Sequence, residues 1–109
     1  MEDGEVDIVY VATPHSHHYQ HARLALEAGK HVLVEKPITV NAEQCKELRR
    51  VARERGRFCM EAVWTRFFPL SLEVVRLVRE GSLGDVKRVY ADFGFWNDVG
   101  VEFGDMHRK

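Results

Sequence analysis

A lysine between a glutamate and a proline is the residue of this sequence whose position most suggests chemistry. Glu35-Lys36-Pro37 directly follows the apolar run His31-Val32-Leu33-Val34, so Lys36 lies at the mouth of a predicted buried strand. Because Pro37 restricts the backbone just after the strand, the Lys36 side chain has a defined direction. An ammonium at such a mouth can donate a hydrogen bond to a hydroxyl and stabilise a developing alkoxide. The alternative is a solvated lysine in a turn.

Glu35 is the natural electrostatic partner of Lys36. Adjacent strand residues point to opposite faces, however. We therefore expect one of the two side chains to contact protein and the other to contact a ligand.

Two further predicted strand ends carry polar or aromatic residues. Thr13-Pro14-His15 follows the run 6–12, which is rich in β-branched residues and typical of a strand buried on both faces. Trp64-Thr65-Arg66 follows the run 58–63. If the strands are parallel, all three carboxyl ends lie on one edge of the sheet, where open α/β sheets bind ligands.

Trp64 and Arg66 flank Thr65 and would share a face in extended structure. Tryptophan can wall a substrate or nicotinamide pocket, and arginine can form two parallel hydrogen bonds with an anionic ligand. The alternative is a packing cluster between domains, formed with Phe67 and Phe68.

Histidines are dense at the start of the predicted helix 17–28, at positions 15, 17, 18 and 21. His17 and His21 lie four residues apart, on one helical face. A metal site is conceivable, but no cysteine or carboxylate cluster accompanies the run, so no metal is predicted. Surface or packing roles and contact with a bound nucleotide both remain open.

The elements that would position these residues alternate between strands and helices. Strands are predicted at 6–12, 31–34 and 58–63, and helices at 17–28 and from the N-cap Asn41 to Gly56, with Gln44 in capping-box register. This order predicts an α/β fold with a parallel sheet. A change of character near residue 63 predicts a domain boundary. An amphipathic helix over 71–80, a half-exposed antiparallel strand over 86–95 and a loop over 97–109 follow.

Composition excludes several classes of partner. The formal net charge is −1 over 109 residues, which gives no reason to expect nucleic acid or an anionic membrane surface. No apolar run approaches the length of a membrane span or of a signal peptide, so a cytoplasmic location is expected. Cys45 and Cys59 are interpreted as reduced packing residues, with a disulfide or redox role as the alternative.

Common nucleotide and catalytic motifs are missing. The sequence has no G-x-G-x-x-G fingerprint, and Gly81-x-x-Gly84 follows a helix rather than a strand and is interpreted as a turn. Walker, G-x-S-x-G, H-E-x-x-H and C-x-x-C motifs are absent as well.

The motifs taken together resemble a known family. VDIVYVATPHSHHYQHARLALEAGKHVLVEKPITVNAEQ (6–44) is similar to the second half of the nucleotide-binding domain of the glucose–fructose oxidoreductase and inositol dehydrogenase (Gfo/Idh/MocA) family. MEAVWTRFFPL (60–70) and EGSLGDVKRVYADFGF (80–95) resemble the branch that contains dimeric dihydrodiol dehydrogenases and NADP-dependent D-xylose dehydrogenases.

The resemblance implies a fold, a reaction and a set of site residues. The fold is a partial Rossmann-type parallel sheet (1–63), which lacks the first strands and glycine-rich loop, followed by the beginning of an α+β substrate and dimerisation domain (64–109). The reaction passes hydride from a sugar or trans-dihydrodiol hydroxyl to NADP, with NAD possible, in a homodimer. Lys36 is the implied catalytic residue. The implied cofactor contacts are Thr13, Pro14, His17, Glu35, Lys36, Pro37, Trp64 and Arg66, and the implied substrate-pocket residues are Trp64 and Phe93.

The sequence also departs from the family pattern. The upstream phosphate-binding loop is missing, and so is the downstream G-G-x-L-x-D-x-G-x-Y segment with its acid–base tyrosine. We therefore expect the 109 residues to be an inactive part of a longer enzyme. The alternative is a non-catalytic truncated paralogue or interaction module that pairs through exposed sheet edges.

Overall fold

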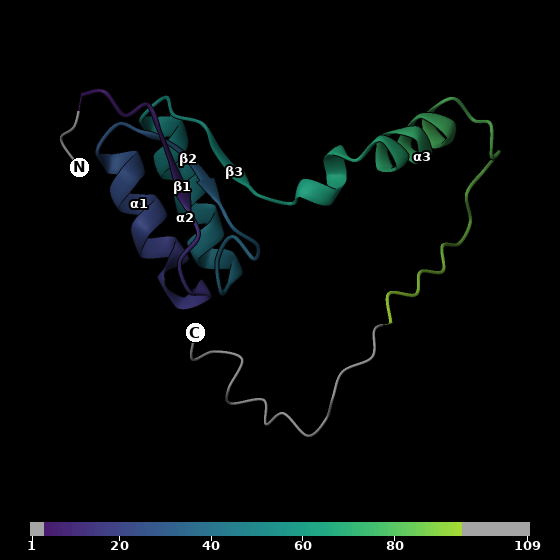
Figure 1. Cartoon of the computed structure of the whole chain (residues 1–109), viewed down its shortest axis with the longest axis horizontal. Helices are drawn as coiled ribbons and strands as arrows, with labels where there is room; N and C mark the ends of the chain where they lie inside the picture. Colours follow the sequence, from purple (N-terminus) through teal and green to yellow (C-terminus); the bar gives the residue numbers. More distant parts are fainter. Residues whose placement is uncertain (1–3, 95–109) are drawn as a thin grey trace, which may run out of the picture. The chain divides into compact units, whose positions relative to one another are not determined.

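The computed structural model describes residues 4–94. Within this range the strands are β1 (Ile8–Val11), β2 (His31–Val34) and β3 (Cys59–Glu61), and the α-helices are α1 (His18–Glu27), α2 (Ala42–Glu54) and α3 (Pro69–Arg79) (Figure 1). Short 3-10 helices cover His15–His17 and Trp64–Phe67. The chain forms two compact units, residues 1–73 and 74–109. The predicted domain boundary between residues 63 and 64 stays a prediction.

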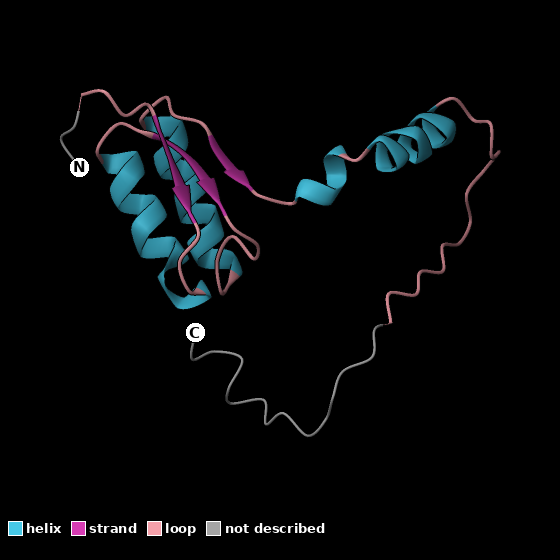
Figure 2. Ribbon diagram, in the orientation of Figure 1, coloured by secondary structure: helices cyan, strands magenta, loops and turns pink. Residues whose placement is uncertain are grey.

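The three strands form one parallel sheet in the order β1-β2-β3 (Figure 2). The predicted α/β fold with a parallel sheet is confirmed. In register, Val11 lies beside Val34 and Val34 lies beside Glu61, so the three strands end at the same level.

Both crossover helices of the sheet, α1 and α2, cover the same face of it, as Figure 1 shows. Successive right-handed crossovers in one direction place their helices on one side. The core lies between this face and the helices. It contains Val11, Ala22, Ala25, Leu26, Val32, Val34, Leu48, Val51 and Ala52.

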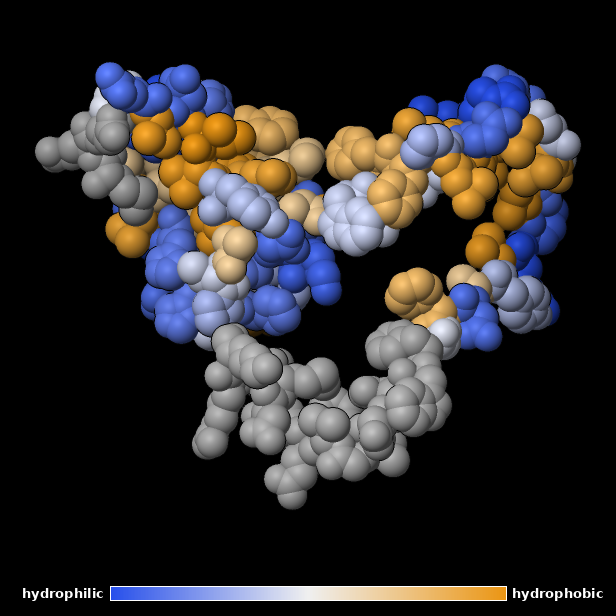
Figure 3. Space-filling view, viewed as in Figure 1, coloured by the Kyte–Doolittle hydropathy of each residue, from blue (hydrophilic) through white to orange (hydrophobic). Residues whose placement is uncertain are grey.

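The opposite face of the sheet is open, so the prediction that β1 is buried on both faces was wrong. Ile8 and Tyr10 are 53% and 56% exposed, whereas Val11 on the helical side is buried. Tyr10 pairs in register with Leu33, and Leu33 with Met60. Figure 3 shows hydrophobic residues over the strand region of the first unit. A run of β-branched residues signals a strand, but it does not show how many faces find a covering element.

The ends of α1 and α2 follow the expected local chemistry. Gly29 and Gly56 adopt positive φ angles of 73° and 60° just after the helices, a conformation that favours glycine. Asn41 caps α2, because its side-chain oxygen accepts a hydrogen bond from the Gln44 N–H at 2.9 Å. The reciprocal half of the predicted capping box does not form, since the buried Gln44 Oε1 has no partner among the described residues.

Leu24 of α1 is apolar but 51% exposed, so it lies outside the buried face of the helix. The buried positions of α1 are His18, Ala22, Ala25 and Leu26.

The predicted helix over 71–80 is present as α3, which begins earlier, at Pro69. Proline is favoured in the first turn, where its missing N–H has no helical partner in any case. The predicted strand over 86–95 is wrong for residues 86–94, which form no strand. Alternation indicates a strand only where another strand can pair with it, and no such partner lies in the described chain. The predicted loop over 97–109 lies outside the described residues.

Within residues 4–94, none of the helices has both the length and the apolar character needed to cross a bilayer.

Candidate functional site at the carboxyl edge of the sheet

Two polar segments leave the carboxyl edge of the sheet side by side. Residues 12–14, here called the Thr13 loop, follow β1, and residues 35–38, here called the Lys36 turn, follow β2. Because the strands are parallel and in register, both segments leave the same edge, as does the segment after β3. The predicted convergence of the three strand ends is confirmed.

Lys36 is exposed, and its ammonium makes no hydrogen bond or ion pair with any residue between 4 and 94. Pro37 after it is also exposed, and the peptide bond between them is cis. The one cationic side chain of the turn is therefore available to a ligand.

Glu35 has protein partners instead. Its Oε1 accepts a hydrogen bond from the Tyr10 hydroxyl, and its Oε2 accepts one from the Lys36 N–H at 3.1 Å. The bond from Tyr10, and then that from the Lys36 N–H, lowers the pKa of Glu35. The same hydroxyl bond raises the pKa of Tyr10. Glu35 therefore links the backbone of the Lys36 turn to β1 through hydrogen bonds.

Glu61, the last residue of β3, holds the Lys36 turn from the side of that strand. Its Oε1 accepts a hydrogen bond from the Ile38 N–H at 2.9 Å. Sequence reasoning placed Glu61 at the end of the third strand but assigned no role to it, and it missed Tyr10. The register offered a signal for them, because each lies at or near the carboxyl end of a strand beside β2.

His18 is the buried histidine of the run. Its side chain is 0% exposed, whereas His15 and His17 are exposed. The ring Nδ1 lies 2.8 Å from the Pro37 carbonyl oxygen, and Nε2 lies 2.8 Å from that of Thr13. His18 thus contacts both the Thr13 loop and the Lys36 turn. The family resemblance assigned the cofactor contact to His17, which is exposed, and His18 beside it was not singled out.

The other predicted residues of this loop lie near one another. Thr13 Oγ1 is 3.1 Å from His21 Nδ1, and the Pro14 carbonyl accepts a hydrogen bond from the His17 N–H at 2.8 Å. The His17 ring stacks on that of His21, with centroids 5.6 Å apart. Within residues 4–94, no three histidine, cysteine or acidic side chains gather as metal ligands.

Trp64 and Arg66 do not lie in extended structure, so the argument that they share a face was wrong. They belong to the 3-10 helix Trp64–Phe67, in which residues two apart point in different directions. The Arg66 N–H bonds to the Val63 carbonyl at 3.1 Å and closes this turn. Trp64 packs edge-to-face against Phe68, with centroids 4.9 Å apart.

Phe93 lies in the second unit and is 93% exposed. Its role in a substrate pocket stays a prediction, as do the cofactor contacts assigned to Trp64 and Arg66.

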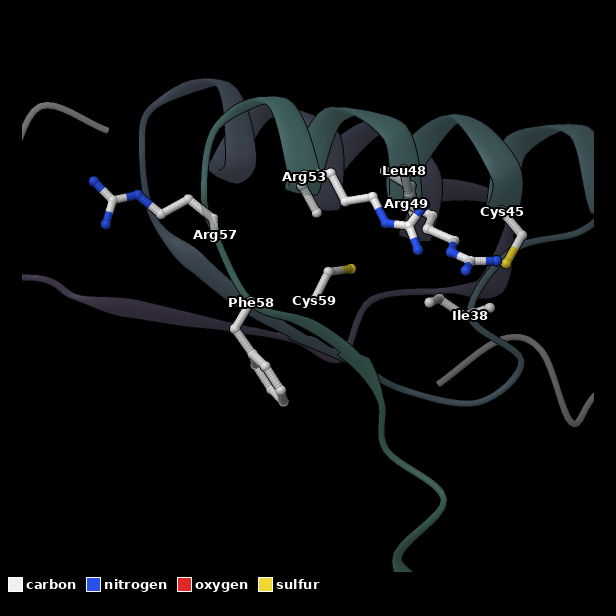
Figure 4. Close-up of a pocket in the computed structure, with 9 residues that line it drawn as sticks. Ile38, Cys45, Leu48, Arg49, Arg53, Arg57, Phe58 and Cys59 are labelled. Atoms are coloured by element: carbon white, nitrogen blue, oxygen red, sulfur yellow. The ribbon is translucent and has the colours of Figure 1, made fainter.

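A cavity of about 390 Å³ lies between α2 and β3, and Ile38 of the Lys36 turn is among its lining residues. Figure 4 shows Arg49 and Arg53 of α2 beside it, with the thiols of Cys45 and Cys59. Burial raises the pKa of the Cys59 thiol. None of the predicted site residues lines this cavity, so we place the candidate site at the carboxyl edge.

Comparison with known proteins shows which family this chain is similar to. Residues 1–63 match the model of an oxidoreductase family with an NAD-binding Rossmann fold. D-xylose 1-dehydrogenase (NADP(+)) of Hypocrea jecorina is 50% identical, over 99% of this chain and 29% of that protein. Trans-1,2-dihydrobenzene-1,2-diol dehydrogenase of Danio rerio is 50% identical, over 85% of this chain and 28% of that protein. The chain thus spans less than a third of the length of these relatives.

Solved structures show the same fold. An NAD-binding oxidoreductase of Klebsiella pneumoniae superposes with a TM-score of 0.72 at 36% identity, over 76% of this chain and 22% of that one. A 3-ketoreductase of Actinomadura kijaniata, solved with NADP and TDP-benzene, superposes with a TM-score of 0.67 at 42% identity, over 73% of this chain and 25% of that one. The family match covers more than half of the sequence, and the parallel sheet agrees with it. The chain therefore belongs to the Gfo/Idh/MocA oxidoreductase family, with part of an NAD-binding Rossmann fold.

Proposed function

We propose that this chain carries the lysine-bearing side of the active site of an NADP-dependent oxidoreductase that oxidises a sugar or trans-dihydrodiol hydroxyl. The observation that carries the proposal is the Lys36 turn. Its ammonium makes no hydrogen bond or ion pair with residues 4–94, while Glu35 and Glu61 hold the backbone of the turn. The names of the two curated relatives give D-xylose and a dihydrodiol as substrates, and the name of the first also includes NADP.

The residues at the carboxyl edge fit a nicotinamide cofactor and an alcohol. A bound nicotinamide would supply the acceptor for the hydride of the carbinol carbon, and the hydroxyl proton would pass to a general base. The Lys36 ammonium donates a hydrogen bond to the substrate oxygen and stabilises the negative charge that develops there. The Thr13 loop, Pro37 and Trp64 are the groups that would border the cofactor. NADP is proposed as the cofactor, with NAD as the alternative.

Ligand binding at this edge is testable on the chain itself. Because the sequence contains no phosphate-binding glycine loop, NADP should bind weakly, and amide NMR detects weak binding. We expect NADP to shift the amide signals of residues 13–15 and 35–38 in the unmodified chain. Lys36→Met should reduce these shifts, whereas Lys46→Met, which changes an exposed lysine on α2, should leave them unchanged. Shifts confined to other regions, or identical in both variants, would refute the proposal.

We also propose that the 109 residues have no measurable turnover by themselves. Pyrophosphate binding requires backbone N–H groups at a helix N-terminus after a glycine-rich turn, and the sequence offers no such motif. An assay with NADP and D-xylose should give no NADPH above the level without protein. Catalysis by the purified chain would contradict this part of the proposal.

A second candidate function is an interaction module that pairs through its sheet. The open sheet face, with Ile8 and Tyr10 exposed, and the outer edges of β1 and β3 favour it. Homodimerisation belongs to the same proposal. Copurification with a full-length homologue would support the module, whereas a monodisperse monomer at all concentrations would refute it.

A further inference from the structure

We propose that His18 is a positioning residue, whose buried ring holds the Thr13 loop and the Lys36 turn in fixed places so that both can face one ligand. The inference rests on the proposed function for the identity of that ligand. The geometry of His18 itself needs no ligand.

The burial of His18 sets it apart from its neighbours. It is the first residue of α1 and is fully buried, although the histidines at positions 15 and 17 are exposed. Burying a polar ring costs free energy unless its nitrogens are hydrogen-bonded. Each ring nitrogen lies 2.8 Å from a backbone carbonyl oxygen, so a ring N–H on either side has an acceptor within hydrogen-bond distance.

The two carbonyls belong to different strand ends. Pro37 follows β2 and lies 19 residues after His18, whereas Thr13 follows β1 and lies five residues before it. Glu61 bonds to the Lys36 turn, and Glu35 joins the turn to Tyr10 of β1, but neither carboxylate bonds to the Thr13 loop. Among residues 4–94, His18 is therefore the side chain whose hydrogen bonds join the loop and the turn directly.

The chemistry of the imidazole decides which atom donates and which accepts in each of these two contacts. Both partners are carbonyl oxygens, which only accept, so the ring must donate each bond. A neutral ring has one N–H to donate, and a protonated ring has two. The charged and titratable groups that face the ring are the His15 ring, packed edge-on with centroids 5.3 Å apart, and the Glu35 carboxylate.

Three substitutions separate the two bonds. In His18→Asn the amide nitrogen takes the place of Nδ1 and keeps the donor toward Pro37. In His18→Gln it takes the place of Nε2 and keeps the donor toward Thr13. His18→Leu retains an apolar side chain and loses both donors.

Hydrogen exchange reads each strand end separately. The Ile38 N–H, bonded to Glu61, reports on the Lys36 turn, and the His17 N–H, bonded to Pro14, reports on the Thr13 loop. We expect Ile38 to exchange about tenfold faster in the Gln and Leu variants and near the original rate in Asn. His17 should exchange faster in Asn and Leu and near the original rate in Gln. Gln20→Ala, at an exposed position of α1, is the control and should change neither rate.

A residue that only fills space would give a different result. Equal loss of protection at both amides in all three variants, or no loss in His18→Leu, would overturn the proposal. If His18→Leu fails to fold, the Asn and Gln variants still make the comparison. In the unmodified chain, NMR of the ring must show at least one slowly exchanging His18 ring N–H, and its absence would also overturn the proposal.

The link to the ligand has its own readout. In the NADP titration, the response of residues 35–38 should persist in His18→Asn and fall in His18→Gln. If NADP shifts nothing even in the unmodified chain while the exchange pattern holds, the proposed function fails and the link between the strand ends stands. If NADP binds but both variants respond alike, the positioning role fails.

Discussion

Helices α2 and α3 are both amphipathic, yet only one of them has a buried residue. In α2, Leu48, Val51 and Ala52 pack into the core, whereas no residue of α3 is buried. The apolar side chains Leu72, Val75 and Val78 of α3 are all exposed. The difference teaches that an apolar stripe specifies a helix, but burial requires a sheet or helix that meets the stripe.

Among the tests of this comparison, truncation of a core leucine should change the free energy of unfolding most. Leu26→Ala should lower the free energy of unfolding by about 2–5 kcal/mol, because a fully buried side chain leaves a cavity. Leu72→Ala in α3 should change it by less than about 0.5 kcal/mol. Urea unfolding followed by circular dichroism measures both. Equal effects would mean that α3 packs as tightly as α1.

Removal of the cap of α2 should have an intermediate effect. Asn41→Ala should cost about 1 kcal/mol, since the Gln44 N–H loses its side-chain acceptor. Asn41→Asp keeps an acceptor oxygen and is the matched control. Urea unfolding of both variants tests the cap, and indistinguishable midpoints would show that it contributes nothing.

The hydroxyl of Tyr10 should have a smaller effect, visible through pH. Its bond lowers the pKa of Glu35, so the stability it contributes is present above the ordinary glutamate value of 4.5 and is lost as pH falls through the lower folded value. In Tyr10→Phe the Glu35 pKa should rise toward 4.5, as carbon NMR of the carboxyl can measure. Tyr90→Phe, whose hydroxyl accepts from Arg88, should leave it unchanged. An unchanged Glu35 pKa in Tyr10→Phe would rule out the hydrogen bond between Tyr10 and Glu35.

The smallest expected effect is on the reaction rate of the Cys59 thiol, and it involves no change in stability. Burial raises the pKa of its thiol above the ordinary value of 9.0, and only the thiolate reacts. In a Cys45→Ser background, iodoacetamide should react with Cys59 more slowly in the folded chain than in urea at the same pH. Equal rates would mean that the β3 edge opens freely.

Much of the first unit could be predicted from sequence. Alternating apolar runs and glycine-terminated helices fixed the order of elements, and this order implied parallel strands and a shared edge for Lys36 and Thr13. The open face of the sheet was missed because the pattern of β1 does not show which elements cover it. His18 was missed although helical spacing offered a signal for it, because it lies four residues before the buried Ala22 and on the same face of α1.

The chain after β3 shows more clearly what the sequence pattern alone could not predict. Residues 86–94 alternate as a strand does, but strand formation is a property of a pair and not of one segment. Trp64 and Arg66 were judged as an extended pair, although the chain turns immediately after Val63. In both places the local pattern was real, and the partner or the backbone conformation decided the outcome.

Tyr10 belongs to two surfaces at once. Its ring forms part of the open sheet face, and its hydroxyl holds the Glu35 carboxylate of the Lys36 turn. A molecule that covers the open face and a ligand of the Lys36 edge must change each other's affinity if both bind differently when this bond is broken. By thermodynamic reciprocity, that ligand changes the affinity of the open face by the same factor. One phenol thus couples two binding equilibria on different sides of the sheet.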